Sequence, residues 1–408
     1  LGDVYKRQSF MCIYFIADLI MFAFVMISFP TIRTGAANHL VVQSSTRLQK
    51  RRNKMFMLSC IMLAMIWGFR SYTIGVDTPE YAKFIMGING FFGNITHPRE
   101  DLESGFLCIM KFVLFFIQNP TAVFCLQTFC LFGIIYKLYK YVNPQNSTWC
   151  LLFYFVFHWN MMSLVSVAFR QAISATILLY GVYLMEKNYV TIKEAKIKIY
   201  RNKKFIVPLL IMLLAATVHK ATLVLFPLLI VAFLVRINKK TAYILVLITL
   251  IISLFFSNLI STTFDLLMNT FSSSQSDVLN HMSYYSETLS DGVNTLVSSL
   301  LRSLIFFSII YYTDKEKIGS VYFNGLIIMA CLFNIFSASE QAGRLLFVFS
   351  LLCGCMYIPS VTQRKWKPRI LFLMFTLLYM YRAYSAFATW TSVNIGDTTL
   401  PYYFFWEK

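Results

Sequence analysis

The chain has 408 residues, of which 58% are hydrophobic and only 13% are charged. Soluble domains carry about 25% charged residues, so this composition excludes an ordinary water-soluble enzyme. The net charge of +18 lies in short loops between apolar runs, which argues against a nucleic-acid-binding protein. Because apolar runs near the length of a membrane span recur, the sequence predicts an all-α polytopic membrane protein with about 12 transmembrane helices.

The N-terminal residues fit no element, and we expect a non-native or disordered leader over residues 1–9. A single integral membrane domain is expected over 10–408. The apolar run from Phe10 to Phe29 holds Asp18 and lacks a convincing cleavage site, so we expect a retained span rather than a signal peptide. The predicted spans are 10–30, 55–70, 120–138, 148–162, 164–185, 205–218, 221–236, 243–260, 295–312, 321–338, 345–361 and 370–388.

Basic loops set the expected orientation. Lysine and arginine are concentrated in residues 31–54, 186–204 and 362–369, and the positive-inside rule assigns these loops to the cytoplasm. With twelve spans the basic loops all fall on one side. The two long segments 71–119 and 261–294 then lie outside, as do both termini.

The segment from Gly105 to Gln118 is apolar enough to be a thirteenth span. Counting it as a crossing would place the basic residues 193–204 outside, against the positive-inside rule. We therefore predict a re-entrant or interfacial helix on the outer side, ended by Asn119-Pro120.

Charged residues recur at the predicted outer ends of the spans. Arg170 is expected about two turns below the outer end of its span, and Gly75 allows a tight turn before Asp77. The set comprises Arg70, Asp77, Glu103, Arg170, His219, Lys220, Glu340, Arg344 and Arg382. Charges at membrane depth mark functional sites, and an excess of cations favours an anionic ligand such as a phosphate. The alternative is structural ion pairing, as between Arg70 and Asp77 or Glu340 and Arg344.

Several ordered blocks carry a family resemblance: FRSYTIGVDTPEY, DLESGF, FRQAISATILLYGVYLMEKN, HKATLVLFPLL, AGRLL and LPYYFF. Together they resemble the EpsG/Wzy-type exopolysaccharide (O-antigen or capsule) polymerases. The first block departs from the more frequent family form in having Val76 where Thr precedes the Asp. The resemblance implies a GT-C-like helical bundle with outer interfacial helices.

It also implies glycosyl transfer outside the bacterial cytoplasmic membrane, from a chain on undecaprenyl pyrophosphate to a sugar hydroxyl of a new lipid-linked unit. The implied partners are that lipid-linked oligosaccharide, membrane lipid, and chain-length regulator and flippase proteins. No metal, nucleotide or other cofactor is implied. The sequence agrees in lacking a P-loop, a dinucleotide fingerprint and a metal-binding D-x-D.

Within this reaction, cations stabilise the departing pyrophosphate. Arg170 and Arg344 are our first candidates, followed by Arg70, Lys220 and Arg382. Asp77 is the expected base for the acceptor hydroxyl, with His219 as its rival and Glu103 as a third option. Further substrate contacts are expected from Gly75, Gln171 and Glu340.

Two other functions share the same substrates. A transporter or flippase of lipid-linked oligosaccharides needs cations reachable from both faces and usually shows internal repeats, and we find no repeat. A ligase or acyltransferase that uses the same carrier with another acceptor is not separable from a polymerase by these residues.

Overall fold

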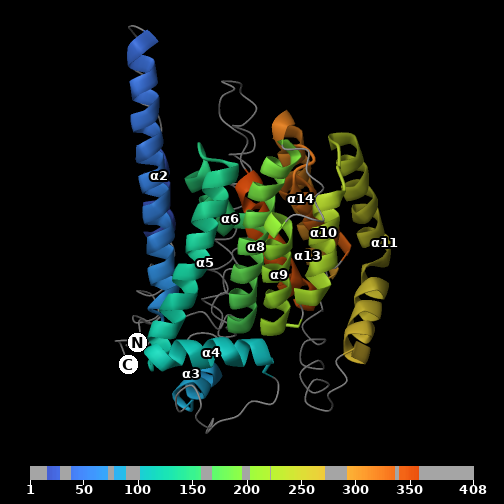
Figure 1. Cartoon of the computed structure of the whole chain (residues 1–408). Helices are drawn as coiled ribbons and strands as arrows, with labels where there is room; N and C mark the ends of the chain where they lie inside the picture. The colour runs from blue at the N-terminus through green and yellow to red at the C-terminus, as the bar shows by residue number, and fades with distance from the viewer. Residues whose placement is uncertain are drawn as a thin grey trace, which may run out of the picture. The chain divides into compact units, whose positions relative to one another are not determined.

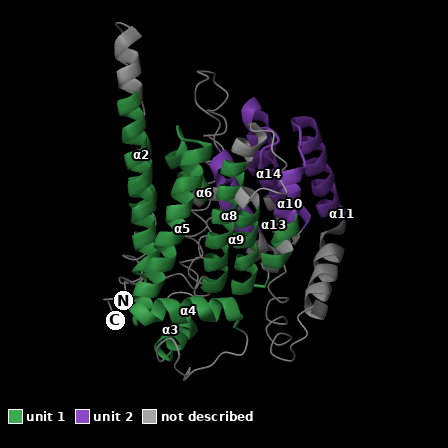
Figure 2. Cartoon of the chain, viewed as in Figure 1, with its two compact units in different colours: residues 1–227, 360–364, 375–408 green, residues 228–359, 365–374 purple. Residues whose placement is uncertain are grey.

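The computed structural model describes residues 16–27, 38–71, 78–88, 102–157, 168–194, 203–220, 222–271, 292–335 and 340–357. Over these ranges the chain is all-helical, without strands, as the composition predicts. The chain forms two compact units (Figure 2). Unit 1 comprises Leu1–Pro227, Ser360–Arg364 and Phe375–Lys408, and unit 2 comprises Leu228–Pro359 and Lys365–Met374. The predicted leader, the cytoplasmic loop 362–369 and the last span lie outside the described residues.

Unit 1 holds a helix over Ile16–Ile27 and the helices from α2 to α9 (Figure 1). Their bounds are α2 Asn38–Gly68, α3 Thr78–Met86, α4 Ser104–Phe116, α5 Pro120–Val142, α6 Ser147–Phe157, α8 Phe169–Glu194 and α9 Lys203–Val218. The start of α5 follows from its sequence. Asn119 caps the helix by accepting from the Thr121 backbone nitrogen at 2.9 Å, and Pro120 occupies the first turn, where it needs no hydrogen-bond acceptor.

Helix α4 lies roughly perpendicular to α5, α8 and α9, across the ends of α8 and α9 (Figure 1). Its 13 residues span about 20 Å, which is shorter than the apolar core of a bilayer. A helix is therefore present over most of the predicted segment 105–118, and its place at the outer membrane surface stays a prediction. Gly105 makes the close contact possible, because a Cβ there would lie 2.6 Å from the Thr217 carbonyl oxygen of α9.

The pair α8 and α9 also packs through a glycine. A Cβ on Gly181 would lie 2.4 Å from Cγ of Met212 and 3.1 Å from the Pro208 carbonyl oxygen. In lipid, apolar helices gain nothing from burying apolar surface against each other, so their association depends on close packing. Small residues such as glycine allow the backbones to approach closely enough for it. The two helices are thereby held together near the middle of α8.

A buried cluster of aromatic and aliphatic side chains packs around α4 and joins it to α3, α5, α8 and α9. The Phe169 ring lies 5.3 Å from that of Tyr81, 6.1 Å from that of Phe106 and 5.2 Å from that of Phe124. Edge-on and tilted ring contacts of this kind add about 0.5–1.5 kcal/mol each beyond their burial. The cluster packs these five helices firmly against one another.

Helix α10, Thr222–Leu234, begins in unit 1 and ends in unit 2. Unit 2 also contains α11 Lys239–Phe271, α13 Gly292–Tyr312, α14 Val321–Ile335 and α15 Glu340–Cys353. Two buried asparagines of α14 bind its neighbours. Asn324 donates to the carbonyl oxygens of Ala232 and Val235, and Asn334 donates to that of Val246.

Several predicted boundaries were wrong. The basic segment 31–54 was predicted as a loop, yet α2 is helical from Asn38. Helix α8 continues to Glu194 inside the predicted loop 186–204, and α11 continues to Phe271 inside 261–294. Lysine, arginine, leucine and glutamate are good helix formers, so a helix does not end where its apolar stretch ends.

Among the described helices, Pro120–Val142 meets the length and composition needed to cross a membrane, while shorter apolar helical segments, such as Ile206–Val218 and Val321–Ile335, are 10–17 residues long. The prediction of twelve spans therefore stays a prediction. Polar residues divide the apolar stretches, and short stretches of this kind need tilted packing or local thinning of the bilayer.

Candidate functional site

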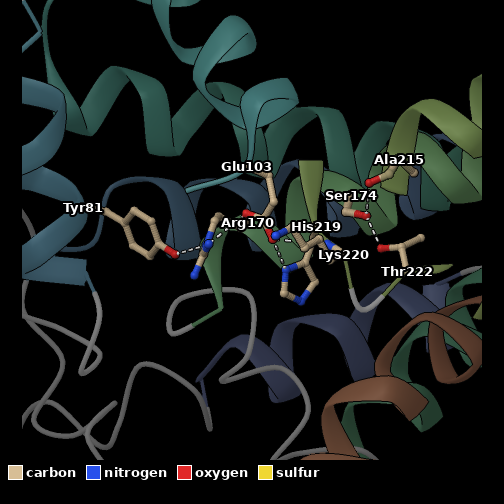
Figure 3. Close-up of polar contacts among 8 residues, drawn as sticks. All are labelled: Tyr81, Glu103, Arg170, Ser174, Ala215, His219, Lys220 and Thr222. Carbon is tan, nitrogen blue, oxygen red and sulfur yellow. Dashed lines mark hydrogen bonds and ion pairs between the residues drawn. The ribbon is translucent and has the colours of Figure 1, made fainter. Parts of the chain in front are cut away.

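The Glu103 carboxylate contacts three residues from two other chain segments (Figure 3). One carboxylate oxygen, Oε2, accepts from Nη1 of Arg170 at 2.8 Å. The other, Oε1, accepts from the backbone nitrogen of Lys220 at 3.1 Å and lies 3.4 Å from Nδ1 of His219. We call Tyr81, Glu103, Arg170, His219 and Lys220 the Glu103 cluster.

Helix ends bring these residues together. Glu103 is the residue just before α4, Arg170 lies in the first turn of α8, and His219 and Lys220 form the turn between α9 and α10. Backbone bonds fix that turn, because the nitrogen of Thr222 donates to the His219 carbonyl oxygen at 3.0 Å. The cluster therefore depends on α4 crossing the ends of α8 and α9.

Arg170 is held from two sides. Its Nε donates to the Tyr81 hydroxyl at 2.8 Å, while Nη1 binds Glu103. The backbone nitrogen of Ala172 donates to the Ala168 carbonyl oxygen, and α8 begins at Phe169. Arg170 therefore lies in the first turn of its helix, whereas the sequence predicted a position about two turns inside it. An arginine at a helix end reaches water more readily than one at membrane depth, and its side chain is 17% exposed.

His219 and Lys220 contact Glu103 through different groups. The His219 ring approaches with Nδ1, and its side chain is 25% exposed. At 3.4 Å this contact is longer than an ordinary hydrogen bond, and catalytic contacts of this length often shorten when substrate binds. Lys220 uses its backbone nitrogen, and its side chain is exposed.

The Glu103 carboxyl, which precedes α4 and lies outside any predicted span, stays ionised. Its burial raises the pKa, but the contact with His219, the charge of Arg170 and the Lys220 backbone N–H together outweigh burial and lower the pKa to about 2. The carboxylate side chain is only 9% exposed. It is therefore a fixed negative charge beside one guanidinium, one imidazole and one backbone N–H.

A second polar contact supports the cluster one turn along α8. The Ser174 hydroxyl donates to the Ala215 carbonyl oxygen of α9 at 2.9 Å and shares a hydrogen bond with the Thr222 hydroxyl of α10 (Figure 3). Helices α8, α9 and α10 are thus joined one turn along α8 from Arg170. These hydroxyls leave the ends of α8, α9 and α10 little freedom to separate.

The structure brings together four of the residues predicted from sequence: Glu103, Arg170, His219 and Lys220. Arg70 contacts residues of α2 and α5. It is fully buried, donates to the Trp67 carbonyl oxygen, and places its guanidinium 4.7 Å from the centre of the Phe124 ring. Gln171 is buried next to Arg170 on α8.

The other predicted residues are not placed in this cluster. Glu340 begins α15, and Arg344 lies one turn later, both in unit 2, and their side chains are not described. Asp77, Gly75 and Arg382 lie outside the described residues. The proposed Arg70–Asp77 and Glu340–Arg344 pairs stay predictions.

The sequence analysis missed Tyr81, Ser174 and Thr222. Tyr81 ends the quoted block FRSYTIGVDTPEY, and Ser174 follows Arg170 by four residues, on the same helix face. Their positions within these blocks were the available signal. Uncharged hydroxyls, however, give no composition signal in an apolar chain.

The arrangement offers cationic groups for an anion and an imidazole for proton transfer at one place. A model of the EpsG family matches residues 53–404, which include all the residues of the Glu103 cluster. The chain belongs to the EpsG family. No curated protein and no solved structure matches it.

EpsG membership, with the all-helical fold, identifies a helical membrane protein of polysaccharide biosynthesis. The EpsG family is associated with exopolysaccharide polymerisation. Its match begins within α2 and runs through both units, so the Glu103 cluster and the α14 asparagines both lie inside the family's shared region.

Proposed function

We propose that this EpsG protein polymerises lipid-linked oligosaccharide repeat units on the outer face of the bacterial cytoplasmic membrane. The growing chain leaves undecaprenyl pyrophosphate and is joined to a sugar hydroxyl of a new lipid-linked unit. The observation that carries the proposal is the gathering of Arg170, Lys220 and His219 around Glu103 at the ends of α8, α9 and α10.

The charge balance of the cluster suits a pyrophosphate leaving group. The Glu103 cluster contains two cationic residues, Arg170 and Lys220, and one carboxylate, so its formal charge is positive before any protonation of His219. Arg170 contacts the carboxylate with its guanidinium, whereas the Lys220 side chain is exposed. Negative charge develops on the pyrophosphate as the glycosidic bond breaks. Cations already in place stabilise that charge without reorganising during the reaction.

Position also supports transfer at a membrane surface. The cluster lies at helix ends, where an apolar carrier can remain among the helices while its pyrophosphate and sugars meet water. Arg344 and Arg382 are proposed to add further phosphate contacts, and Asp77 with Gly75 to approach the acceptor. Chain-length regulators and a flippase are the proposed protein partners.

The test begins with deletion of the gene in its host. We expect single-unit lipid-linked glycan to accumulate on the outer side. This glycan is extracted and supplied to the purified protein in vesicles. Polymerase activity gives a ladder of products and releases undecaprenyl pyrophosphate.

Other outcomes would overturn the proposal. Glycan trapped inside the deletion strain, with transport across vesicles and no ladder, would show a flippase. Transfer of the single unit to another acceptor, again without a ladder, would show a ligase.

A further inference from the structure

Glu103 occupies the position that precedes a helix, yet its side chain makes no capping hydrogen bond to α4. Residues at this position usually satisfy the first backbone N–H groups of their own helix. Here the carboxylate instead turns towards α8 and the α9–α10 turn, where it has three partners. Its orientation is therefore set by the cluster and not by the needs of α4.

The same contacts make Glu103 a poor base. A pKa of about 2 keeps the carboxyl ionised, but it also means that the carboxylate binds a proton weakly near neutral pH. Both oxygens already accept from other groups. Glu103 is therefore poorly suited to take a proton from a sugar hydroxyl.

His219 lies where a base needs to be. Its Nδ1 faces Oε1 of Glu103, while the other ring nitrogen points away from Glu103 (Figure 3). A carboxylate beside Nδ1 favours the tautomer with the proton on Nδ1, which leaves Nε2 as the acceptor. The same division of roles, with a carboxylate orienting a histidine base, occurs on unrelated folds.

We propose that Glu103 is a positioning residue, which orients His219 through Nδ1 so that Nε2 takes the proton of the acceptor hydroxyl. This inference rests on the proposed polymerase function. The acceptor oxygen forms a bond to the anomeric carbon, and the bond from that carbon to the pyrophosphate oxygen breaks. Its electron pair stays on the pyrophosphate, and the hydroxyl proton passes to Nε2.

One carboxylate thereby serves two groups. It stabilises the imidazolium that forms when Nε2 takes a proton, and it holds Arg170 together with the Tyr81 hydroxyl. The charged and titratable groups that face His219 among the described residues are Glu103, Arg170 and Lys220, with Tyr81 joined through Arg170. Of these, the carboxylate alone favours the protonated imidazole.

The test is the pH dependence of chain elongation, measured with the host glycan in vesicles. Glu103→Gln removes the charge and keeps the size. We expect elongation to fall by on the order of 100-fold. The acidic limb of the pH–rate profile should also move to lower pH, because the imidazolium that forms on His219 loses the carboxylate beside Nδ1.

A matched control is Glu80→Gln. Glu80 lies on the surface of α3, where it pairs with Lys83 at 3.0 Å and has no contact with the cluster. This variant should keep the wild-type rate and profile. Glu103→Asp keeps the charge, so its rate should fall while the acidic limb stays near that of the wild type.

Several outcomes overturn the inference. A Glu103→Gln enzyme with a reduced rate but an unmoved acidic limb makes Glu103 purely structural. If Glu103→Gln does not fold, His219→Ala decides, because retained elongation there removes His219 as the base. A wild-type protein that gives no ladder refutes the polymerase function itself, whatever the variants do.

Discussion

The Glu103 cluster of unit 1 and the α14 asparagines of unit 2 both place polar side chains between helices, but with different chemistry. The cluster uses charges at helix ends, where Arg170 and His219 stay partly exposed. Asn324 and Asn334 are neutral, completely buried and bound to backbone carbonyl oxygens or neighbouring hydroxyls. The buried neutral amides join helices within unit 2, whereas the charges at helix ends of unit 1 remain partly exposed.

This difference is informative because both sets lie in one family-matched region. Asn324 accepts from the Ile237 backbone nitrogen and donates to two carbonyl oxygens at the end of α10. Both the oxygen and the nitrogen of that amide form hydrogen bonds to backbone groups of unit 2. Polar burial alone is therefore no sign of function in this chain, and exposure together with charge is the better criterion.

The largest effect is expected from Arg170→Ala. Loss of the guanidinium removes a phosphate contact and leaves the Glu103 carboxylate without its nearest cation. We expect chain elongation to fall by about 100-fold or more. Arg236→Ala, at an exposed arginine of unit 2, should elongate normally. Equal rates for the two variants would remove the functional meaning of the cluster.

Asn324→Leu should affect stability and spare the chemistry. The substitution leaves the Ile237 nitrogen and two carbonyl oxygens without their partner, at a cost of roughly 3 kcal/mol. The measurement is thermal unfolding in detergent, combined with elongation per folded molecule. A slower enzyme with an unchanged unfolding temperature would contradict the structural role of the α14 asparagines.

Gly105→Ala tests the close packing of α4 against α9. The added methyl meets the Thr217 backbone, which should cost about 1–3 kcal/mol and displace Glu103 from its partners. Gly133→Ala is the matched control, since a Cβ there has no neighbour within 4 Å. The control should be neutral or slightly stabilising, by about 0.5–1 kcal/mol. Elongation and unfolding temperature should both fall for Gly105→Ala alone.

The smallest effect concerns pH. The pKa of Glu103 is lowered from 4.5 to about 2, so its contacts stabilise the fold fully above pH 4.5, and this stabilisation is lost as the pH falls towards 2. The difference in unfolding temperature between the wild type and Glu103→Gln should shrink as the pH falls from 4.5 towards 2. A difference that grows over this range would show that Glu103 does not stay ionised.

Much of this site could be predicted from sequence because it lies at boundaries. A charge after a long apolar run shows where a helix ends, and this placed Glu103 at the start of α4 and His219-Lys220 between α9 and α10. What could not be predicted was pairing. Glu103 meets Arg170 across 67 residues and Lys220 across 117, and no local pattern determines such contacts.

Two other features were not predicted: the position of Arg170 along its helix and the role of the uncharged asparagines of α14. Arg170 was expected two turns inside its span, because the apolar residues before it suggested an earlier helix start than Phe169. The α14 asparagines lie in an apolar run and were given no role in the prediction. A neutral amide barely changes the hydropathy of a segment, although its hydrogen bonds decide which helices meet.

The crossing of α4 over α8 and α9 also bears on how the chain is assembled. During synthesis Glu103 leaves the ribosome 67 residues ahead of its arginine and 117 ahead of the turn that donates to it. If α4 lies at the boundary of lipid and water, as the sequence predicts, it can wait there with its acid hydrated until those later segments have been inserted. The carboxylate is then desolvated only when its cations arrive, so biogenesis never requires a lone charge inside the bilayer.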